Sequence, residues 1–157
     1  YKRLVPGFEA LKAWFWEDED GLRLVGARSE AWDTSFAVQA LIAAGETDRA
    51  VLERAHGFLL DNQLREDWPG YDTHYQLTRK GGWCFTRKEH RWPVSDCTAE
   101  ALVALEQLGE RGFATGADRL DEDARFILER HNADGGFGSY EANRGEGRPA
   151  TTVQTVA

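Results

Sequence analysis

Residues 95–109 read SDCTAEALVALEQLG, and their pattern decides the class of the fold. Apolar side chains recur every three or four residues between Asp96 and Leu108, which predicts an amphipathic helix. These positions are Ala101, Leu102, Leu105 and Leu108. Ser95 is a candidate N-terminal cap, and Gly109 is the residue at which this helix is expected to stop.

Three further segments, 33–44, 48–62 and 118–130, have the same helical periodicity. Gly45 follows the first as a C-terminal stop, and Thr47 precedes the second as a candidate cap. No segment alternates convincingly between apolar and polar residues as a half-buried strand does. The sequence therefore predicts an all-α fold.

A long connection, residues 63–93, separates two of the predicted helices and is rich in aromatic residues. These are Trp68, Tyr71, Tyr75, Trp83, Phe85 and Trp92. Connections of this length without their own secondary structure are uncommon in compact domains and are often functional. We therefore expect this connection to contribute to a site.

The chain contains an internal repeat in which an apolar helix end is followed by a polar pair and then by a Gly-Gly-aromatic turn. The first unit has Phe58-Leu59, Asn62-Gln63 and Gly81-Gly82-Trp83; the second has Phe126-Ile127, His131-Asn132 and Gly135-Gly136-Phe137. Glycine permits the positive φ and close approach that such a turn needs. A single helix pair cannot bury its apolar face alone, so we expect the units to stack as in a solenoid or toroid.

Composition narrows the class of protein. The net charge of −8 argues against a nucleic-acid partner, because such partners select a basic face. Two cysteines without a CxxC pair indicate neither a disulfide scaffold nor a redox motif, which favours a reducing, intracellular setting. No stretch approaches the ~20 apolar residues of a membrane span. Because the chain has no Met and begins at Tyr1, we expect residues 1–157 to be a single fragment of a longer protein.

Asp96 has two possible roles. An Asp in the first turn of a helix is usually there because its charge complements the helix dipole. Here the helix follows a segment that carries Trp83, Phe85 and Trp92, and an acid among aromatic rings is desolvated and retains its proton. A neighbouring hydrogen-bond donor and the helix N-terminus would stabilise the carboxylate left after proton transfer. Cys97, taken alone, is more typical of a buried small side chain than of a nucleophile.

Three segments resemble the oxidosqualene cyclases, the family of lanosterol and cycloartenol synthases. The segments are GGWCF (81–85) with WPVSDCTAE (92–100), WDTSFAVQAL (32–41) and DGGFGSYE (134–141). The Gly-Gly-aromatic units resemble the QW repeats of that family in degenerate form, with His131 where Gln is usual and a long insertion after Gln63. The resemblance implies part of an α/α toroid of the class II terpenoid cyclase type, with about two helix-pair repeats in residues 1–157.

The resemblance also implies roles for individual residues. Asp96 matches the acid that protonates the epoxide, and Cys97 matches the neighbour that forms a hydrogen bond with it. Cavity-lining aromatics that stabilise carbocations are matched by Trp32, Phe85 and Tyr140. Positions near the pocket that influence the product are matched by His90, which is similar to the cycloartenol enzymes, and Val94, which is similar to the lanosterol enzymes. Trp83 belongs to a repeat and is interpreted first as structural.

The substrate implied by the resemblance is 2,3-oxidosqualene, cyclised to a sterol or triterpene alcohol. Squalene-hopene cyclases share the fold but carry an Asp-rich motif, and Val94 and Cys97 stand where two of those acids would be. One supported acid suffices for an epoxide, whose oxygen is more basic than an alkene carbon. This departure favours the epoxide substrate over squalene, and a squalene-hopene-type cyclase is the alternative. A zinc prenyltransferase β-subunit is disfavoured because Asp96 and Cys97 are adjacent and no histidine has ligand spacing. A non-catalytic helical scaffold leaves the combined matches unexplained.

Such an enzyme is an isomerase that needs no metal or organic cofactor, because all bonds rearrange within one substrate. The resemblance implies a complete enzyme that is intracellular and attached peripherally to a membrane surface, since its substrate dissolves in lipid. The partners expected for residues 1–157 are this isoprenoid substrate and the remainder of the same chain. The fragment alone is expected to be inactive.

Overall fold

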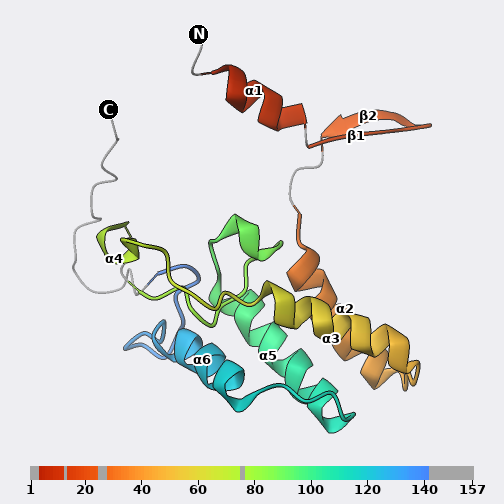
Figure 1. Cartoon of the computed structure of the whole chain (residues 1–157), viewed down its shortest axis with the longest axis vertical. Coiled ribbons are helices and arrows are strands. Elements are labelled where there is room, and N and C mark those ends of the chain that lie inside the picture. Colours follow the sequence, from red (N-terminus) through yellow and green to blue (C-terminus); the bar gives the residue numbers. More distant parts are fainter. Residues whose placement is uncertain (1–3, 13, 25–27, 75–76, 142–157) are drawn as a thin grey trace.

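The computed structural model describes residues 4–12, 14–24, 28–74 and 77–141. Four long helices form the main body: α2 (Glu30–Ala43), α3 (Arg49–Asn62), α5 (Ser95–Glu110) and α6 (Ala117–Leu128). Shorter elements are α1 (Val5–Lys12), the single turn α4 (Tyr71–His74) and the 3-10 turn η1 (Lys88–His90). Figure 1 shows α5 between the neighbouring helices of the body, and α5 contacts α2, α3 and α6. The predicted all-α body is confirmed.

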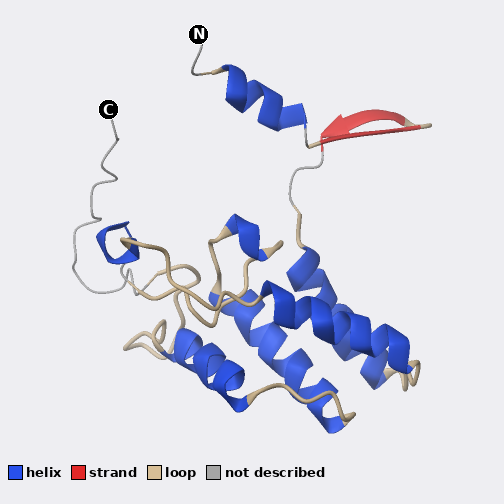
Figure 2. Cartoon of the chain, viewed as in Figure 1, coloured by secondary structure: helices blue, strands red, loops and turns tan. Residues whose placement is uncertain are grey.

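One hairpin was missed by the sequence analysis. Strands β1 (Phe15–Asp18) and β2 (Gly21–Leu24) pair antiparallel, and Gly21 adopts φ +113° at the turn. The segment is too short, and too mixed in polarity, to reveal alternation over several residues. In Figure 2 the hairpin lies apart from the helical body, and all eight of its residues are exposed.

Neither of the two expected N-terminal helix caps, Thr47 and Ser95, occupies the cap position. Asp48, rather than Thr47, caps α3, since its carboxylate accepts the N–H groups of Ala50 and Val51 at 2.9 and 3.4 Å. Ser95 is the first residue of α5, and Val94 occupies the cap position without a side-chain bond.

Of the two expected C-terminal stops, Gly109 is wrong for α5 and Gly45 is confirmed for α2. Helix α5 continues through Gly109 to Glu110, and the left-handed residue that ends the turn is Gly112, with φ +86°. Gly45, with φ +84°, does follow α2 as predicted.

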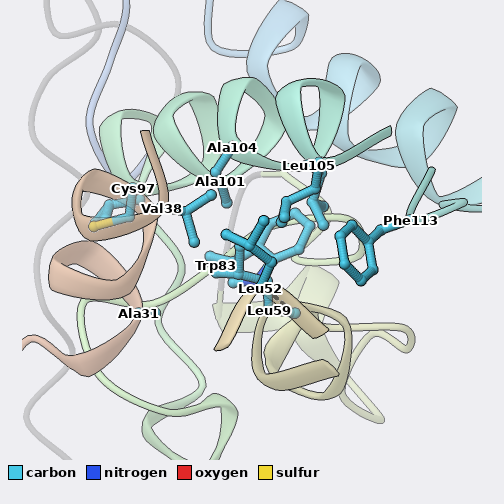
Figure 3. Close-up of a cluster of buried hydrophobic side chains, with 12 residues drawn as sticks. Ala31, Val38, Leu52, Leu59, Trp83, Cys97, Ala101, Ala104, Leu105 and Phe113 are labelled. Atoms are coloured by element: carbon cyan, nitrogen blue, oxygen red, sulfur yellow. Dashed lines mark hydrogen bonds between the residues drawn. The ribbon is translucent and has the colours of Figure 1, made fainter. Parts of the chain in front are cut away.

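The core lies between α2, α3 and α5 and contains the indole of Trp83. Figure 3 shows Trp83 among Leu52 and Leu59 of α3 and Ala101 and Leu105 of α5. Trp83 is 0% exposed, and its indole N–H donates to the carbonyl of Leu59 at 2.9 Å. That carbonyl is one of the last four of α3, which have no partner inside the helix. The structural interpretation of Trp83 is supported by this burial.

The two Gly-Gly-aromatic turns share a backbone contact but differ in burial. The N–H of Leu64 donates to Gly82 O at 3.0 Å, and the N–H of Asn132 donates to Gly136 O at 2.8 Å. Leu64 directly follows the polar pair of its repeat, whereas Asn132 is the second member of its pair. Phe137 is 50% exposed, whereas its counterpart Trp83 is fully buried. The second glycine of each turn thus accepts a backbone N–H, but only the first turn has its aromatic residue buried in the core.

A polar network closes the first turn. The side-chain amide of Gln63 donates to the carbonyls of Gly81 and Arg119 at 3.2 and 3.0 Å. The guanidinium of Arg119 donates to Leu60 O at 2.9 Å, which satisfies another carbonyl at the end of α3. Gln63 therefore links α3, the glycine turn and α6.

None of the helices in the parts of the chain listed above is long and apolar enough to cross a membrane.

Candidate active site

The start of α5 is fixed to the Gly-Gly-Trp turn by two hydrogen bonds, and a third lies within the helix start itself. The N–H of Val94 donates to Trp83 O at 2.9 Å, which makes an isolated antiparallel bridge. The Thr98 hydroxyl accepts the N–H of Trp83 at 2.9 Å and donates to Val94 O at 2.7 Å. These bonds hold residues 94–98, including Asp96 and Cys97, against the buried tryptophan.

Asp96 and Cys97 form a pair of opposite exposure. The thiol of Cys97 is buried, with 1% of the residue exposed, while Asp96 is exposed in the first turn of α5. The carboxylate of Asp96 accepts the backbone N–H of Cys97 at 2.8 Å. Burial and then the Asp96 charge raise the pKa of the Cys97 thiol, and a side-chain hydrogen bond between the two residues adds to this. The thiol therefore stays protonated and available as a donor.

The exposure of Asp96 corrects the expectation that aromatic rings enclose it. The aromatic rings expected around Asp96 pack against other residues. Trp83 packs in the core, and the ring of Phe85 lies 5.6 Å from that of Trp32. Trp92 packs on Tyr140 with 5.0 Å between ring centroids. These rings therefore leave Asp96 open to solvent in this structure.

Trp32 and Phe85 are joined through both backbone and rings. The carbonyl of Phe85 accepts the N–H groups of Ala31 and Trp32 at 3.0 and 3.2 Å, which satisfies two free donors in the first turn of α2. The two rings are tilted by 53°, and Trp32 also makes an edge contact with Phe36 at 4.7 Å. This backbone cap fixes the spacing of the two predicted cavity aromatics.

A hollow of about 980 Å³ opens beside this aromatic pair. Three residues singled out in the sequence, Trp32, Phe85 and His90, line it together with Trp14. The remaining lining residues are Arg28, Ser29, Glu30, Asp33, Thr86, Arg87 and Glu89. Trp14 was not expected at the site; its place in the aromatic run 14–16 was the available signal.

Asp96, Cys97, Val94 and Tyr140 do not line this hollow. Val94 is 1% exposed and is tied to Trp83, so its side chain belongs to the core of this chain. Tyr140 lies nearer to the start of α5, because the carbonyl of its neighbour Ser139 accepts the N–H of Ser95 at 2.9 Å. The structure thus forms two groups: Trp32, Phe85 and His90 at the hollow, and Tyr140 beside α5.

A buried arginine that the sequence analysis did not flag supports the Tyr140 segment. The guanidinium of Arg130 donates to the carbonyls of Phe126, Thr78 and Tyr140 at 2.8, 3.0 and 3.3 Å. Burial lowers its pKa to about 10. Arg130 therefore remains charged at neutral pH and connects α6 to the segment that carries Tyr140.

Cys84 lies beneath the turn that carries His90. Burial raises the pKa of its thiol to about 11, and the backbone N–H groups of Arg91 and Trp92 act in the opposite direction. Repulsion from a Cys84 thiolate would further raise the pKa of Cys97, and both cysteines are free of disulfides. Across the described ranges, no three His, Cys, Asp or Glu side chains gather to hold a metal ion.

Comparison with known proteins shows which family this chain resembles. The family model of the squalene-hopene cyclase C-terminal domain matches residues 28–149. Lanosterol synthase of Homo sapiens is 39% identical over 141 residues, covering 84% of this chain and 19% of that protein. A lanosterol synthase of Aspergillus fumigatus is 36% identical over 145 residues, covering 87% and 19%. Cycloartenol synthase of Dictyostelium discoideum is 32% identical over 142 residues, covering 87% and 20%. The chain spans about a fifth of the length of these relatives.

Proposed function

The chain belongs to the squalene-hopene cyclase C-terminal domain family, and on this premise we propose that it is a segment of an oxidosqualene cyclase. Its helices form part of the α/α toroid of that family. The complete enzyme is an isomerase that converts 2,3-oxidosqualene into a sterol or triterpene alcohol. Residues 1–157 contribute the acid and part of the aromatic lining, in about two QW repeats.

The observation that carries this proposal is the pairing of an accessible carboxyl with a buried thiol at one helix start. The Asp96 carboxyl donates its proton to the epoxide oxygen, the C–O bond opens, and an alkene electron pair closes the first ring. The carboxylate left behind is stabilised by the N-terminus of α5. The thiol of Cys97 supports it as a hydrogen-bond donor, because its raised pKa keeps it protonated.

Cation stabilisation is the proposed role of Trp32, Phe85 and Tyr140. Each π-face contributes about 0.5–2 kcal/mol to a passing carbocation, depending on how dry the cavity is. The support is that Trp32 and Phe85 line one hollow and are held there by the backbone cap on α2. His90 lines the same hollow and is proposed to influence the product. Val94 is proposed to act from the core, through its bridge to Trp83.

The decisive experiment compares Asp96→Asn with a matched variant in the full-length enzyme. Asp118 occupies the same second position in α6 and is also exposed, so Asp118→Asn is the control. A general acid contributes about 10²–10⁴-fold, so Asp96→Asn is expected to lose at least that factor in kcat on 2,3-oxidosqualene. Asp118→Asn should retain kcat within about twofold.

Feeding squalene and oxidosqualene separately distinguishes the substrate classes. Turnover of oxidosqualene alone is expected. Turnover of squalene would favour the squalene-hopene type of cyclase instead. An Asp96→Asn enzyme that retains full turnover would refute the assignment of the acid. The isolated chain is expected to form no product, because its candidate site is open.

We also propose that the remainder of the same polypeptide covers the hairpin. Phe15, Leu22 and Leu24 lie on one face of β1 and β2 by their pairing register and are all more than half exposed. A two-stranded hairpin in water is marginally stable without such a partner. A thiol placed at Leu22 should therefore label slowly in the full-length protein. Labelling as fast as in denatured protein would contradict the proposal.

Membrane attachment and an intracellular location are proposed for the complete enzyme from the lipid solubility of its substrate. Sedimentation with liposomes tests the first point. Recovery of the full-length enzyme entirely in the supernatant, while it remains active on detergent-dispersed substrate, would contradict it. Fractionation of cells that express it tests the second, and activity confined to the culture medium would contradict that location.

A further inference from the structure

The turn formed by residues 88–92 separates two hollows and contributes residues to the lining of both. On one side, Glu89 and His90 line the hollow of about 980 Å³ that also contains Trp32 and Phe85. On the other, Lys88, Glu89 and Arg91 line a second hollow of about 540 Å³, together with Trp68. The conformation of this turn therefore decides where His90 stands relative to the aromatic pair.

The side chains of this turn are exposed, and its contacts are mainly those of its backbone. The N–H groups of Arg91 and Trp92 face the Cys84 thiol, and the Trp92 ring packs on Tyr140. All five residues of the turn are exposed, so close packing does not fix it. Its backbone makes 3-10 bonds from His90 to Arg87 O and from Arg91 to Lys88 O, at 3.0 and 2.9 Å. The N–H of Lys88 also donates to the side chain of Asn62 at 3.2 Å.

Arg91 completes the turn in an unfavourable conformation. Its φ is +59°, and among the described residues it is the one non-glycine residue with positive φ. Non-glycine residues rarely adopt this region because Cβ approaches the backbone too closely. Such a conformation persists only when surrounding contacts enforce it.

The side-chain contact that can enforce it, beside the backbone contacts of Arg91, is a cation–π interaction with Trp68. The guanidinium of Arg91 lies 3.6 Å from the centroid of the Trp68 ring. The residue before Trp68 is anchored, because the carboxylate of Asp67 accepts the N–H of Arg79 and the hydroxyl of Thr78, both at 2.6 Å. The backbone beside Trp68 is thus anchored, and Arg91 joins the turn to the Trp68 ring at the hollow that His90 does not line.

We propose that Arg91 is a positioning residue which, through Trp68, holds the 88–92 turn and thereby sets the product specificity of the site. This inference rests on the proposed cyclase function. Arg91 touches no substrate; it acts by fixing the backbone that carries His90. Loss of the contact lets the turn relax and changes how the cyclising chain is folded in the hollow.

The test uses Arg91→Ala, Trp68→Ala and Trp68→Phe in the full-length enzyme. A matched control exists in the same chain: Arg49 stacks on Phe113 at 4.4 Å, and neither residue lines either hollow. Arg49→Ala therefore removes a contact of the same kind elsewhere. Two readouts are measured: the ratio of minor to major products from 2,3-oxidosqualene, and amide hydrogen exchange of residues 89–92.

An exposed cation–π contact corresponds to about a two- to fivefold change in the population of the held state. Arg91→Ala and Trp68→Ala are each expected to raise both readouts by that factor, and the double variant should add little more. Trp68→Phe keeps an aromatic face and should restore most of the parental ratio. Arg49→Ala should change neither readout.

Product ratios unchanged by Arg91→Ala and Trp68→Ala, in an enzyme that cyclises oxidosqualene, would overturn the specificity role. So would a fall in thermal stability with unchanged ratios, which would make the contact merely structural. A parental enzyme that does not turn over oxidosqualene would instead refute the proposed function. In that case hydrogen exchange still decides whether Arg91 holds the turn, and unchanged exchange overturns the positioning role.

Discussion

Replacing Trp83 by Phe tests whether this residue stabilises the fold as its burial indicates. The substitution removes the indole N–H that satisfies Leu59 O at the end of α3. A lost hydrogen bond costs about 0.5–1.5 kcal/mol, and a buried carbonyl left unpaired costs about 1–3 kcal/mol. The smaller ring also leaves a cavity in the core. We expect a loss of about 2–4 kcal/mol, and about 3–5 kcal/mol for Trp83→Ala.

These losses are measurable by thermal unfolding of the purified 157-residue chain. At the average entropy of unfolding per residue, the 157 residues correspond to about 0.33 kcal/mol/K. Trp83→Phe should therefore lower Tm by about 6–12 °C. Trp16→Phe is the control, since that indole also donates a hydrogen bond, to Asp18 at 2.8 Å, but the residue is 57% exposed. Its Tm should fall by less than about 2 °C. Equal effects of the two substitutions would refute the argument from burial.

Three further substitutions test individual positions of the fold. Gly81→Ala should destabilise the protein by more than about 3 kcal/mol in urea unfolding, because the new Cβ would lie 2.2 Å from the backbone oxygen of Glu122 and φ is +93°. Gly57→Ala, in open space within α3, should instead stabilise it by about 0.5–1 kcal/mol, and a loss there would contradict this expectation. Burial, with a smaller contribution from Glu106, raises the pKa of the Asp123 carboxyl to about 9. Because the folded-state pKa is raised above the ordinary value, the stability contributed by this proton is complete below about pH 4 and is lost as pH rises towards 9. The stability advantage of Asp123→Asn should therefore grow between pH 5 and pH 9, and a constant difference would show that Asp123 does not titrate in that range.

The long helices were predictable because the information for them is local. Apolar residues three and four apart face one side of a helix whatever lies beyond it, so α5 was evident from its own letters. Helix ends were less predictable, since several residues compete for each cap. Asp48 caps α3 although Thr47 precedes it, and α5 passes through Gly109.

The resemblance to the cyclases named candidate site residues, whose roles stay predictions, but it did not give their arrangement in space. The resemblance to the cyclases named Trp32, Phe85 and His90, and the structure brings these three to one hollow. It did not indicate that Asp96 is exposed, that Arg91 stacks on Trp68 or that Trp14 joins the lining. The contacts of Arg91 and Trp14 depend on segments distant along the chain, and the exposure of Asp96 depends on which atoms pack over it.

The sequence alone determined the helical class, the order of the repeats and the motif of Asp96 and Cys97. Tertiary structure decided which side chains are buried from solvent. It buried the Cys97 thiol and left the neighbouring carboxyl open, although the two are adjacent in the chain. It also buried Arg130 and Asp123, whose residue types normally face water. The physical reason is that helical periodicity is a property of neighbours, whereas burial and pKa depend on every atom that folding brings near.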